Sequence, residues 1–185
     1  MLPTRLDAEE AIATLLRYLK CNDHDLLKET PARVVRFYEE YVEGMSMDPK
    51  AVLHKRFPIT FPCDTPVILR AIPFESLCEH HLAPVIGTVS IAYLPDQHVV
   101  GLSKLARVVE ILARRLQLQE RMTSQIADTL FDTLNPKGVA VFVKAEHFCM
   151  TTRGIRKRGA MFETTAVRGV FVREGMGGIK TIFGD

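Results

Sequence analysis

The sequence predicts an α+β domain in which one face of an antiparallel sheet is covered by a pair of helices. Three observations carry this prediction. Residues 85–93 alternate apolar side chains with Thr88 and Ser90, a pattern typical of a half-buried strand. Residues 103–116 and 119–134 repeat apolar side chains at helical spacing. Strand-like segments lie on both sides of this helix pair, so the predicted order is β-β-α-α-β-β.

A helical segment is expected before this domain. Residues 7–20 carry an apolar stripe behind Asp7, which we expect to cap a first helix. The pair Thr30-Pro31 is typical of a helix start, and it predicts a second helix from there to about residue 43. Residues 44–66 hold four of the ten prolines and are expected to be mostly connector. We therefore expect residues 1–65 to form an N-terminal helical segment with its connector.

Residues 66–185 are expected to form the main domain as one structural unit. Ser103 is predicted to cap the first covering helix, and the turn at 135–138 to end the second. The predicted strands are 67–72, 85–93, 139–147 and 164–173, the last of which ends before a glycine-rich tail at 175–178. Because such a sheet leaves edges and one face uncovered, we expect an oligomer.

The composition is that of a globular chain with a sizeable core. Of its 185 residues, 47% are hydrophobic and 25% are charged, and the net charge of +2 predicts neither nucleic-acid nor membrane binding. The longest apolar runs are too short to span a bilayer, and acidic residues interrupt the N-terminal region where a signal peptide would be apolar. We expect a cytoplasmic protein, in which the four cysteines are metal ligands or free thiols before they are disulfides.

Two distant segments contain the residue types of a catalytic metal site. Cys78 and His81 are separated by two residues, so one turn can supply two ligands, and Cys149 is a candidate third. Two thiolates and an imidazole favour Zn²⁺, which in an open site lowers the pKa of bound water from ~15.7 to about 7. The spacing alone is only moderately specific. On its own, Cys149 is better explained as a small apolar side chain in a strand.

Acidic and imidazole groups close to these candidate ligands have two interpretations each. His80 and His147 could transfer protons to and from a substrate, or orient a metal ligand. Glu120 could complement the dipole of the helix that it begins, or accept two N–H bonds from the guanidine-like edge of a purine or pterin. Glu79 could support a ligand or form a salt bridge.

Basic residues form two groups in the sequence. Forked guanidinium groups and lysines suit phosphate binding, whereas a solvated charged surface is the plainer interpretation. A hydroxyl and N–H donors at the start of a helix would add to an anion site. The residues concerned are Ser103, Lys104 and Arg107 in the first group, and Arg153, Arg156, Lys157 and Arg158 in the second.

Five separated motifs resemble those of the GTP cyclohydrolase I family. They are Glu29-Thr-Pro-Ala-Arg33, Ser76-Leu-Cys-Glu-His-His-Leu82, Gly101-Leu-Ser-Lys-Leu-Ala-Arg107, Gln119-Glu-Arg-Met-Thr123 and His147-Phe-Cys-Met-Thr-Thr-Arg-Gly154. The resemblance covers most of residues 28–172 in the same order. It implies the tunnelling fold, whose β-β-α-α-β-β order agrees with the predicted one. It also implies a homodecamer with active sites between subunits.

The resemblance further implies a reaction and assigns residues to it. Members of this family convert GTP to 7,8-dihydroneopterin triphosphate and formate, the first step of a pterin or folate-type pathway. By motif position, Cys78, His81 and Cys149 would bind zinc, and His80 and His147 would transfer protons. Glu120 would bind the guanine edge with Gln119 beside it. The residues implied for the triphosphate and ribose are Ser103, Lys104, Arg107, Arg153, Arg33 and, with less support, Arg36.

Two other interpretations stay open at this point. A related enzyme of the same fold would act on another purine or pterin, and it would keep Glu120 without needing the phosphate-binding residues. A structural zinc module or inactive relative would have a closed four-ligand site and no catalytic histidine. Both histidines and the phosphate-binding group favour the hydrolase. The chain lacks the longer helical C-terminus of many family members, which leaves subunit packing at that end open.

Overall fold

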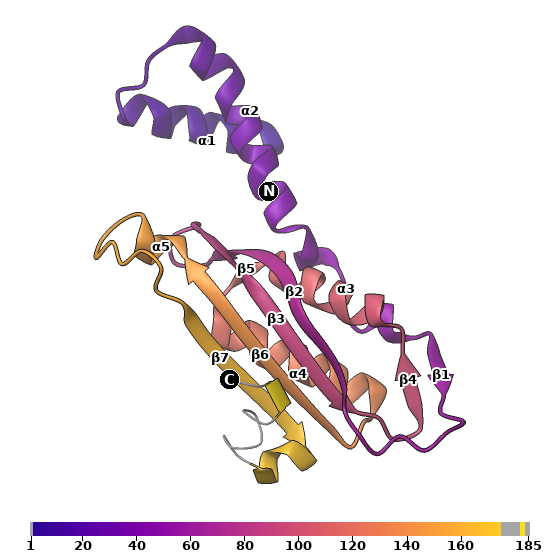
Figure 1. The fold of residues 1–185 in the computed structure, drawn as a ribbon. Helices are drawn as coiled ribbons and strands as arrows, with labels where there is room; N and C mark the ends of the chain where they lie inside the picture. The colour runs from indigo at the N-terminus through magenta and orange to yellow at the C-terminus, as the bar shows by residue number, and fades with distance from the viewer. Residues whose placement is uncertain (1, 175–181, 184–185) are drawn as a thin grey trace. The chain divides into compact units, whose positions relative to one another are not determined.

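The computed structural model describes residues 2–174 and 182–183, and the glycine-rich tail predicted at 175–178 lies outside them (Figure 1). The chain divides into two compact units, one up to Val42 and one from Glu43 onward. The expected division into a helical segment 1–65 and a main domain 66–185 stays a prediction. Among the described helices, none has the length and apolar character needed to cross a membrane.

The first helix begins two residues earlier than its predicted start. Helix α1 (Arg5–Tyr18) is capped by Thr4, whose side chain accepts a hydrogen bond from the Asp7 N–H. The Asp7 carboxylate in turn accepts the Thr4 N–H at 2.7 Å, which completes a capping box. Asp7 is therefore the third helical residue rather than the cap, as the prediction had it.

The predicted start of the second helix at Thr30-Pro31 is wrong. Helix α2 (His24–Tyr41) begins after Asp23, whose side chain accepts the Leu26 N–H at 2.9 Å. Pro31 lies inside this helix. A proline in a helix interior removes one backbone hydrogen bond, and here the helix continues through it. The N-cap at Asp23 satisfies an otherwise free N–H of the first turn, which favours the earlier start.

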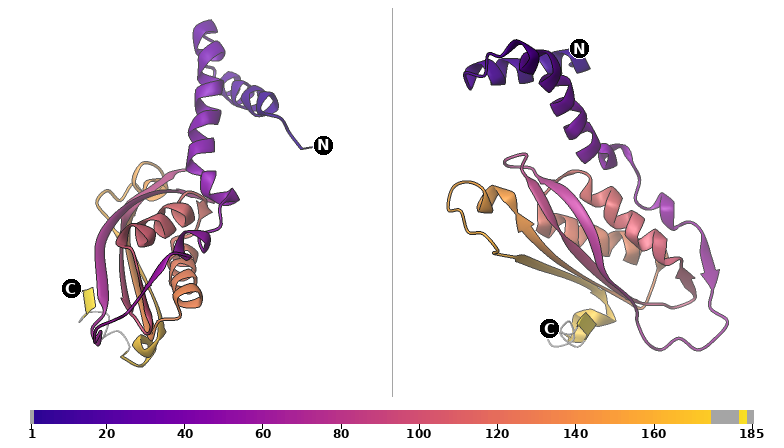
Figure 2. Two further views of the ribbon diagram at one scale, coloured as in Figure 1. Left: turned by 90° about the vertical axis from the view of Figure 1, so that its right-hand side faces the viewer. Right: turned by 45° about the horizontal axis from the view of Figure 1, so that its top comes forward.

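The second unit is built on a five-stranded sheet with the order β5-β2-β3-β6-β7 (Figure 1). The four long strands are antiparallel to their neighbours, and the short β5 is parallel to β2. Helices α3 (Leu102–Ala113) and α4 (Gln119–Leu134) lie together on one face of this sheet (Figure 2). The strands are β2 (Val67–Cys78), β3 (Pro84–Leu94), β5 (Leu116–Gln117), β6 (Gly138–His147) and β7 (Phe162–Gly169). The predicted α+β class and β-β-α-α-β-β order are confirmed.

The core lies between this sheet and the helix pair. The apolar stripes predicted for α3 and α4 are buried, with Leu105, Val108, Ile126 and Leu130 completely inaccessible to solvent. Burial of a leucine or isoleucine side chain contributes about 1.5–3 kcal/mol, so these contacts hold both helices firmly on the strands. The strand residues that face them include Val89, Ile91, Val141 and Val143.

Some elements of the main domain end or begin elsewhere than predicted. Strand β2 continues to Cys78, beyond the predicted end at residue 72. Helix α3 is capped by Gly101, so Ser103 lies within its first turn rather than at the cap. Strand β7 starts at Phe162 and ends at Gly169, followed by a 3₁₀ helix, η3 (Val170–Glu174), so the prediction of a strand over 164–173 is wrong. Gly169 pairs with Gly138, the first residue of β6, so β6 offers no further residue with which β7 could pair.

The predicted connector contains regular structure that belongs to the second unit. Strand β1 (Arg56–Pro58) pairs antiparallel with β4 (His98–Val100) in a separate two-stranded sheet. Two 3₁₀ helices, η1 (Glu43–Ser46) and η2 (Ala51–Leu53), precede it, and Leu53 is fully buried in the core. Such short elements depend on distant partners, so local sequence patterns do not indicate them.

The sheet face opposite the helices is partly covered by the end of the chain. Ile182 and Phe183 pack there with Phe171 and two alanines of the sheet. The Arg70 guanidinium donates hydrogen bonds to the carbonyl oxygens of Ile182, at 2.8 Å, and Phe183. This contact shields a small part of the sheet face that the helix pair leaves uncovered.

Replacing Gly87 with alanine is expected to lower stability by about 2 kcal/mol, because the new methyl group would overpack a well-filled region. Gly87 in β3 pairs with Ala145 of β6, and a Cβ at position 87 would lie 2.6 Å from the Ala145 Cα. Thermal unfolding measures the effect. The control is Gly101→Ala, whose added Cβ meets only the Lys104 side chain at 4.0 Å. Equal melting temperatures for the two variants would contradict this account of the β3–β6 contact.

Candidate active site

Three potential metal donors gather where β2 and β6 end. Cys78 is the last residue of β2, His81 lies in the turn that follows, and Cys149 lies in the short helix α5 (Phe148–Thr151) after β6. Their donor atoms all lie within 4.8 Å of one another, with Cys78 Sγ and His81 Nδ1 3.7 Å apart. Around a tetrahedral ion with bonds of zinc-like length, a sulfur and a nitrogen would be ~3.6 Å apart. The three residues therefore fit such an ion.

The turn after β2 brings Cys78 and His81 to the same side. The Leu82 N–H donates to the Cys78 carbonyl and the Cys78 N–H to the Ala83 carbonyl, both at 2.9 Å. Leu82 has a φ of +50°, in the left-handed region that non-glycine residues seldom adopt. This closed turn makes the side chains three positions apart converge.

The electrostatics of Cys149 favour a bound cation. Burial raises the pKa of the Cys149 thiol, and the adjacent Cys78 thiol raises it further, while the charge of Arg153 acts in the opposite direction. Two thiolates side by side would repel each other in the absence of a cation. A divalent ion removes this penalty and stabilises both thiolates, so the donor set is chemically suited to holding a metal.

A cavity of about 330 Å³ adjoins the three donors. His80, Glu120 and His147 line it together with them. The structure thus brings the predicted metal ligands, both predicted proton-transfer groups and the predicted base-binding carboxylate to one cavity. Its apolar wall is formed by Leu118, Met150, Met161 and Phe162. None of these four was assigned a role from the sequence: Met150 lies within the motif at 147–154, and Leu118, Met161 and Phe162 lie outside the five motifs.

His147 is held by two neighbours. Its Nε2 lies 2.9 Å from Gln119 Oε1, and its ring meets that of Phe162 edge-on with the centroids 5.4 Å apart. Burial lowers the pKa of His147, and the nearby Glu120 carboxylate raises it in part. A lowered pKa favours the neutral imidazole at pH 7, the form that can accept a proton.

Glu79 forms an ion pair with Arg121, which answers the question that the sequence left open about it. The Arg121 guanidinium binds Glu79 Oε2, and it also donates to the Gln117 side chain at 3.1 Å and to the Leu116 carbonyl at 2.9 Å. Arg121 lies in the first turn of α4, and Glu79 follows Cys78 directly. The ion pair therefore ties the metal-binding turn to the helix that carries Glu120.

Replacing Arg121 with methionine is expected to weaken Zn²⁺ binding about tenfold, because groups that orient metal ligands typically contribute 10–100-fold to affinity. Competition with a chelator measures this affinity. The matched control is Arg168→Met. Arg168 lies on β7 and forms an ion pair with Asp128, which is farther along α4 than Arg121. If both variants bound Zn²⁺ as tightly as the unmodified protein, the ion pair would have no role in holding the turn.

Three predicted phosphate-binding residues do not line this cavity, namely Ser103, Lys104 and Arg107. Ser103 and Lys104 lie in the first turn of α3, and Arg107 lies near its middle. This helix follows β4, whose last residue, Val100, donates its N–H to the Tyr93 hydroxyl at 3.3 Å. The cavity is at the other end of β3, where Val85 pairs with His147. Eight strand positions separate Val85 from Tyr93, or about 26 Å. Within one chain, the start of α3 and the cavity therefore lie at opposite ends of the sheet.

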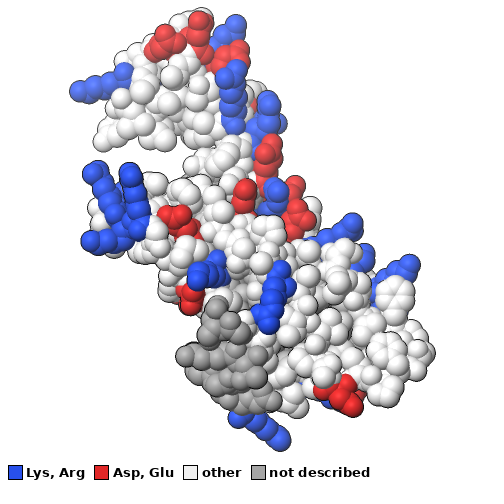
Figure 3. Space-filling model, in the orientation of Figure 1, with Lys and Arg blue, Asp and Glu red and all other residues white. Residues whose placement is uncertain are grey.

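Arg153 lies near the cavity, in the loop after α5, where its charge favours the Cys149 thiolate. Figure 3 shows basic side chains gathered at the end of the molecule that carries α5. The exposed basic residues of this loop are Arg153, Arg156, Lys157 and Arg158. This loop follows the helix that carries Cys149, so it is a source of positive charge for an anionic substrate.

Arg33 and Arg36 are exposed on α2, in the first unit. Arg33 pairs with Glu29 one helical turn away, at 3.0 Å. Because α2 belongs to the other compact unit, its placement relative to the cavity is not part of the site geometry.

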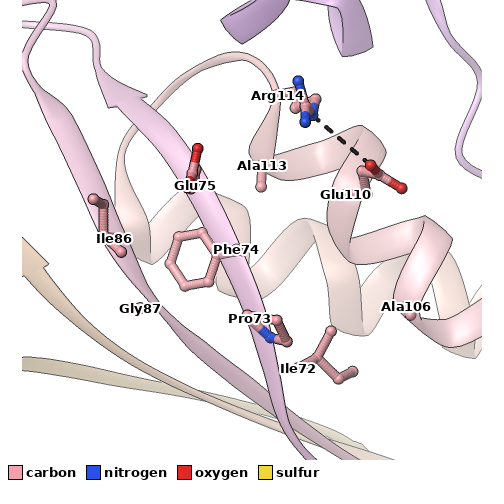
Figure 4. Close-up of a pocket in the computed structure, with 10 residues that line it drawn as sticks. All are labelled: Ile72, Pro73, Phe74, Glu75, Ile86, Gly87, Ala106, Glu110, Ala113 and Arg114. Carbon is pink, nitrogen blue, oxygen red and sulfur yellow. Dashed lines mark ion pairs between the residues drawn. The ribbon is translucent and has the colours of Figure 1, made fainter.

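A second cavity, of about 420 Å³, lies where β2 and β3 meet α3 (Figure 4). Ile72, Phe74 and Ala106 contribute to its largely apolar lining. Its two charged helix residues, Glu110 and Arg114, pair with each other at 3.9 Å. No predicted site residue lines it. The cavity beside Cys78 is therefore the better candidate for catalysis.

Comparisons with known proteins agree with this geometry. A family model described as GTP cyclohydrolase I matches residues 8–178. A curated protein named GTP cyclohydrolase 1 from Wolinella succinogenes is 46% identical over 171 residues, covering 92% of this chain and 91% of that protein. Another of the same name, from Sinorhizobium fredii, is 47% identical over 173 residues, covering 93% and 84%.

A solved structure is also similar, though weakly. The apo archaeosine synthase QueF-Like is 23% identical, with a TM-score of 0.49 over 60% of this chain and 97% of the other. The assignment rests instead on the family model and on the two relatives, which match this chain over more than 90% of its length. The chain belongs to the GTP cyclohydrolase I family.

Proposed function

We propose that this protein is a GTP cyclohydrolase I, a hydrolase that converts GTP and water to 7,8-dihydroneopterin triphosphate and formate. The observation that carries the proposal is the convergence of three metal donors, two histidines and Glu120 at one cavity, in a chain of this family. The product enters folate or pterin biosynthesis. The reaction takes place in the cytoplasm, where the cysteines stay reduced.

In this proposal Cys78, His81 and Cys149 hold a zinc ion, with one coordination position left open. Thiolate and imidazole donors suit Zn²⁺ better than Mg²⁺ or Ca²⁺. When bound, zinc supplies a Lewis acid that makes water a nucleophile at neutral pH. Support comes from the spacing of the donors, whose ligand atoms all lie within 4.8 Å of one another.

The remaining groups of the cavity bind the base and transfer protons. The Glu120 carboxylate accepts two N–H bonds, from N1 and the 2-amino group of guanine. Formate carries C8 away, so both bonds from C8 to the ring nitrogens must break, and each departing nitrogen needs a proton. His80 and His147 donate and accept these protons. The ribose then opens, undergoes an Amadori-type rearrangement and closes the new pterin ring.

The triphosphate is bound by residues from more than one subunit. Arg153 serves the cavity of its own chain, whereas α3, which carries the other basic group, starts beside the end of β3 that lies about 26 Å along the strand from the cavity. We place that group, with Arg33 and Arg36, at the cavity of a neighbouring copy in a homodecamer. Support comes from the sheet edges: among the described residues, β2 pairs with β5 only at Leu77 and Cys78, which leaves most of its outer edge free for another chain.

The test is to identify the products. Purified protein supplied with Zn²⁺ is incubated with GTP, and pterin absorbance and fluorescence are followed together with released formate. We expect equal amounts of both products from GTP and none from ATP, because adenine lacks the N–H pair that Glu120 binds. If zinc were bound tightly and GTP recovered unchanged, the proposal would fail. Turnover of another purine or pterin instead would indicate a related enzyme of the same fold.

A further inference from the structure

Gln119, the first residue of α4, contacts His147 from a position that is only 3% exposed. Resting on the function proposed above, we propose that Gln119 is a positioning residue that fixes the His147 ring and the nitrogen carrying its proton, and that it does not bind the base. The sequence motif placed Gln119 beside Glu120 as a substrate contact. The hydrogen bonds around its side chain assign it a different task.

Every polar atom of the Gln119 amide group is already engaged within the protein. Its Nε2 lies 3.0 Å from the Phe162 carbonyl oxygen, 3.1 Å from Thr164 Oγ1 and 3.3 Å from the Val143 carbonyl oxygen. These are three acceptors for two N–H groups. Its Oε1 faces His147 Nε2 at 2.9 Å. A substrate would have to displace one of these buried bonds to reach the amide nitrogen, and an unpaired buried polar group is costly. Oε1 keeps a second lone pair, but the residue is only 3% exposed.

The two carbonyl oxygens determine which way the amide points. A carbonyl oxygen only accepts hydrogen bonds, so the Gln119 NH₂ group must face Phe162 and Val143. Oε1 is then the atom that faces His147, and it can only accept. His147 Nε2 is therefore the donor and carries a hydrogen. The bond therefore fixes the orientation of the His147 ring and leaves Nδ1 as the ring nitrogen that does not face Gln119.

Two threonines hold the amide in this orientation. The Thr123 hydroxyl lies 2.7 Å from the backbone carbonyl oxygen of Gln119 and donates its only hydrogen there. In the 2.7 Å contact between the Thr123 and Thr164 hydroxyls, Thr164 must then be the donor. Thr164 Oγ1 keeps a lone pair for the Gln119 N–H. An ordered series of bonds thus runs from Thr164 on β7 through α4 to His147 at the end of β6.

The two roles for Gln119 predict different kinetics. A residue that binds guanine contributes to KM for GTP. A residue that orients a proton-transfer group acts on the chemical step, so its loss lowers kcat and leaves KM little changed. Gln119→Met keeps the length of the side chain and removes both the hydrogen-bond donors and the acceptor of the amide. The control is Gln97→Met, which changes an exposed glutamine before β4 that does not line the cavity.

We expect Gln119→Met to lower kcat by about 10–100-fold, with KM for GTP within about twofold of the unmodified value. Zinc content should stay the same, and Gln97→Met should behave like the unmodified protein. A tenfold or larger rise in KM with kcat retained would overturn the proposal and assign Gln119 to the base. Absence of product from the unmodified protein would refute the proposed function instead, so the two failures are distinguishable.

Thr164 gives a second test that leaves α4 untouched. Thr164→Val keeps the shape of the side chain but removes the hydroxyl that fixes the amide, and Thr164→Ser keeps that hydroxyl. We expect the valine variant to lower kcat several-fold and the serine variant to restore most of it, with unchanged KM in both. Equal kcat values for the two variants would overturn the proposal even if Gln119→Met failed to fold.

Discussion

Replacing Cys149 with serine is expected to remove zinc and catalytic turnover together. Cys149 is one of three donors that lie within 4.8 Å of one another, and a serine hydroxyl at neutral pH does not replace a thiolate as a zinc ligand. With two protein donors left, metal affinity should fall steeply. Turnover of GTP should fall by about a thousandfold or more, since the activated water is lost. Metal analysis after dialysis against a chelator, and pterin formation from GTP, measure the two losses.

The control for this variant is Cys63→Ser. Cys63 lies outside the cavity, where its thiol contacts the Thr65 carbonyl at 3.8 Å. We expect this variant to keep both zinc and turnover. A Cys149→Ser protein that retained its zinc would show that the half-buried Cys149 thiol in α5 packs as an apolar side chain and is not a ligand.

Replacing His80 with alanine should separate metal binding from turnover. His80 lines the cavity, but it is not one of the three clustered donors, and its ring lies edge-on to that of His81 with the centroids 6.1 Å apart. We expect zinc content to stay unchanged. Turnover should fall by about 10²–10⁴-fold, the usual contribution of a general acid or base.

An exposed histidine away from the cavity, His54, supplies the control for this second variant. His54→Ala should have the turnover and zinc content of the unmodified protein. Two results would count against the assignment of His80. Full turnover in His80→Ala would mean that it transfers no essential proton. Loss of zinc would mean that it acts on the metal and not on the substrate.

Long periodic segments were the part of the fold that the sequence could predict. The apolar residues of 119–134 recur at helical spacing for four turns. The helix is closed by Asn135, which adopts the left-handed conformation with a φ of +48°. Both bounds of α4 follow from this. The start of α2 could not be predicted, because Asp23 and Thr30-Pro31 both carry the local chemistry of a helix start. Tertiary contacts decide between such sites, and local sequence does not contain them.

For the site, ligand types could be predicted but side-chain directions could not. The residue types of Cys78, His81 and Cys149 indicated a metal, and the structure brings their donor atoms together. Gln119 and Arg121 lie two positions apart but contact different partners. Gln119 contacts His147, and Arg121 contacts Glu79. Motif membership does not reveal such directions, because they depend on where β6 and the metal-binding turn lie around the start of α4.

The most direct test of the central claim is a titration of metal-free protein with zinc while pterin formation from GTP is followed. The account predicts no turnover without metal and a linear rise that saturates at about one zinc ion per chain. Cys149→Ser measured in parallel should show no rise at those zinc concentrations. Full turnover by metal-free protein, or saturation with zinc without any pterin formed from GTP, would contradict the account.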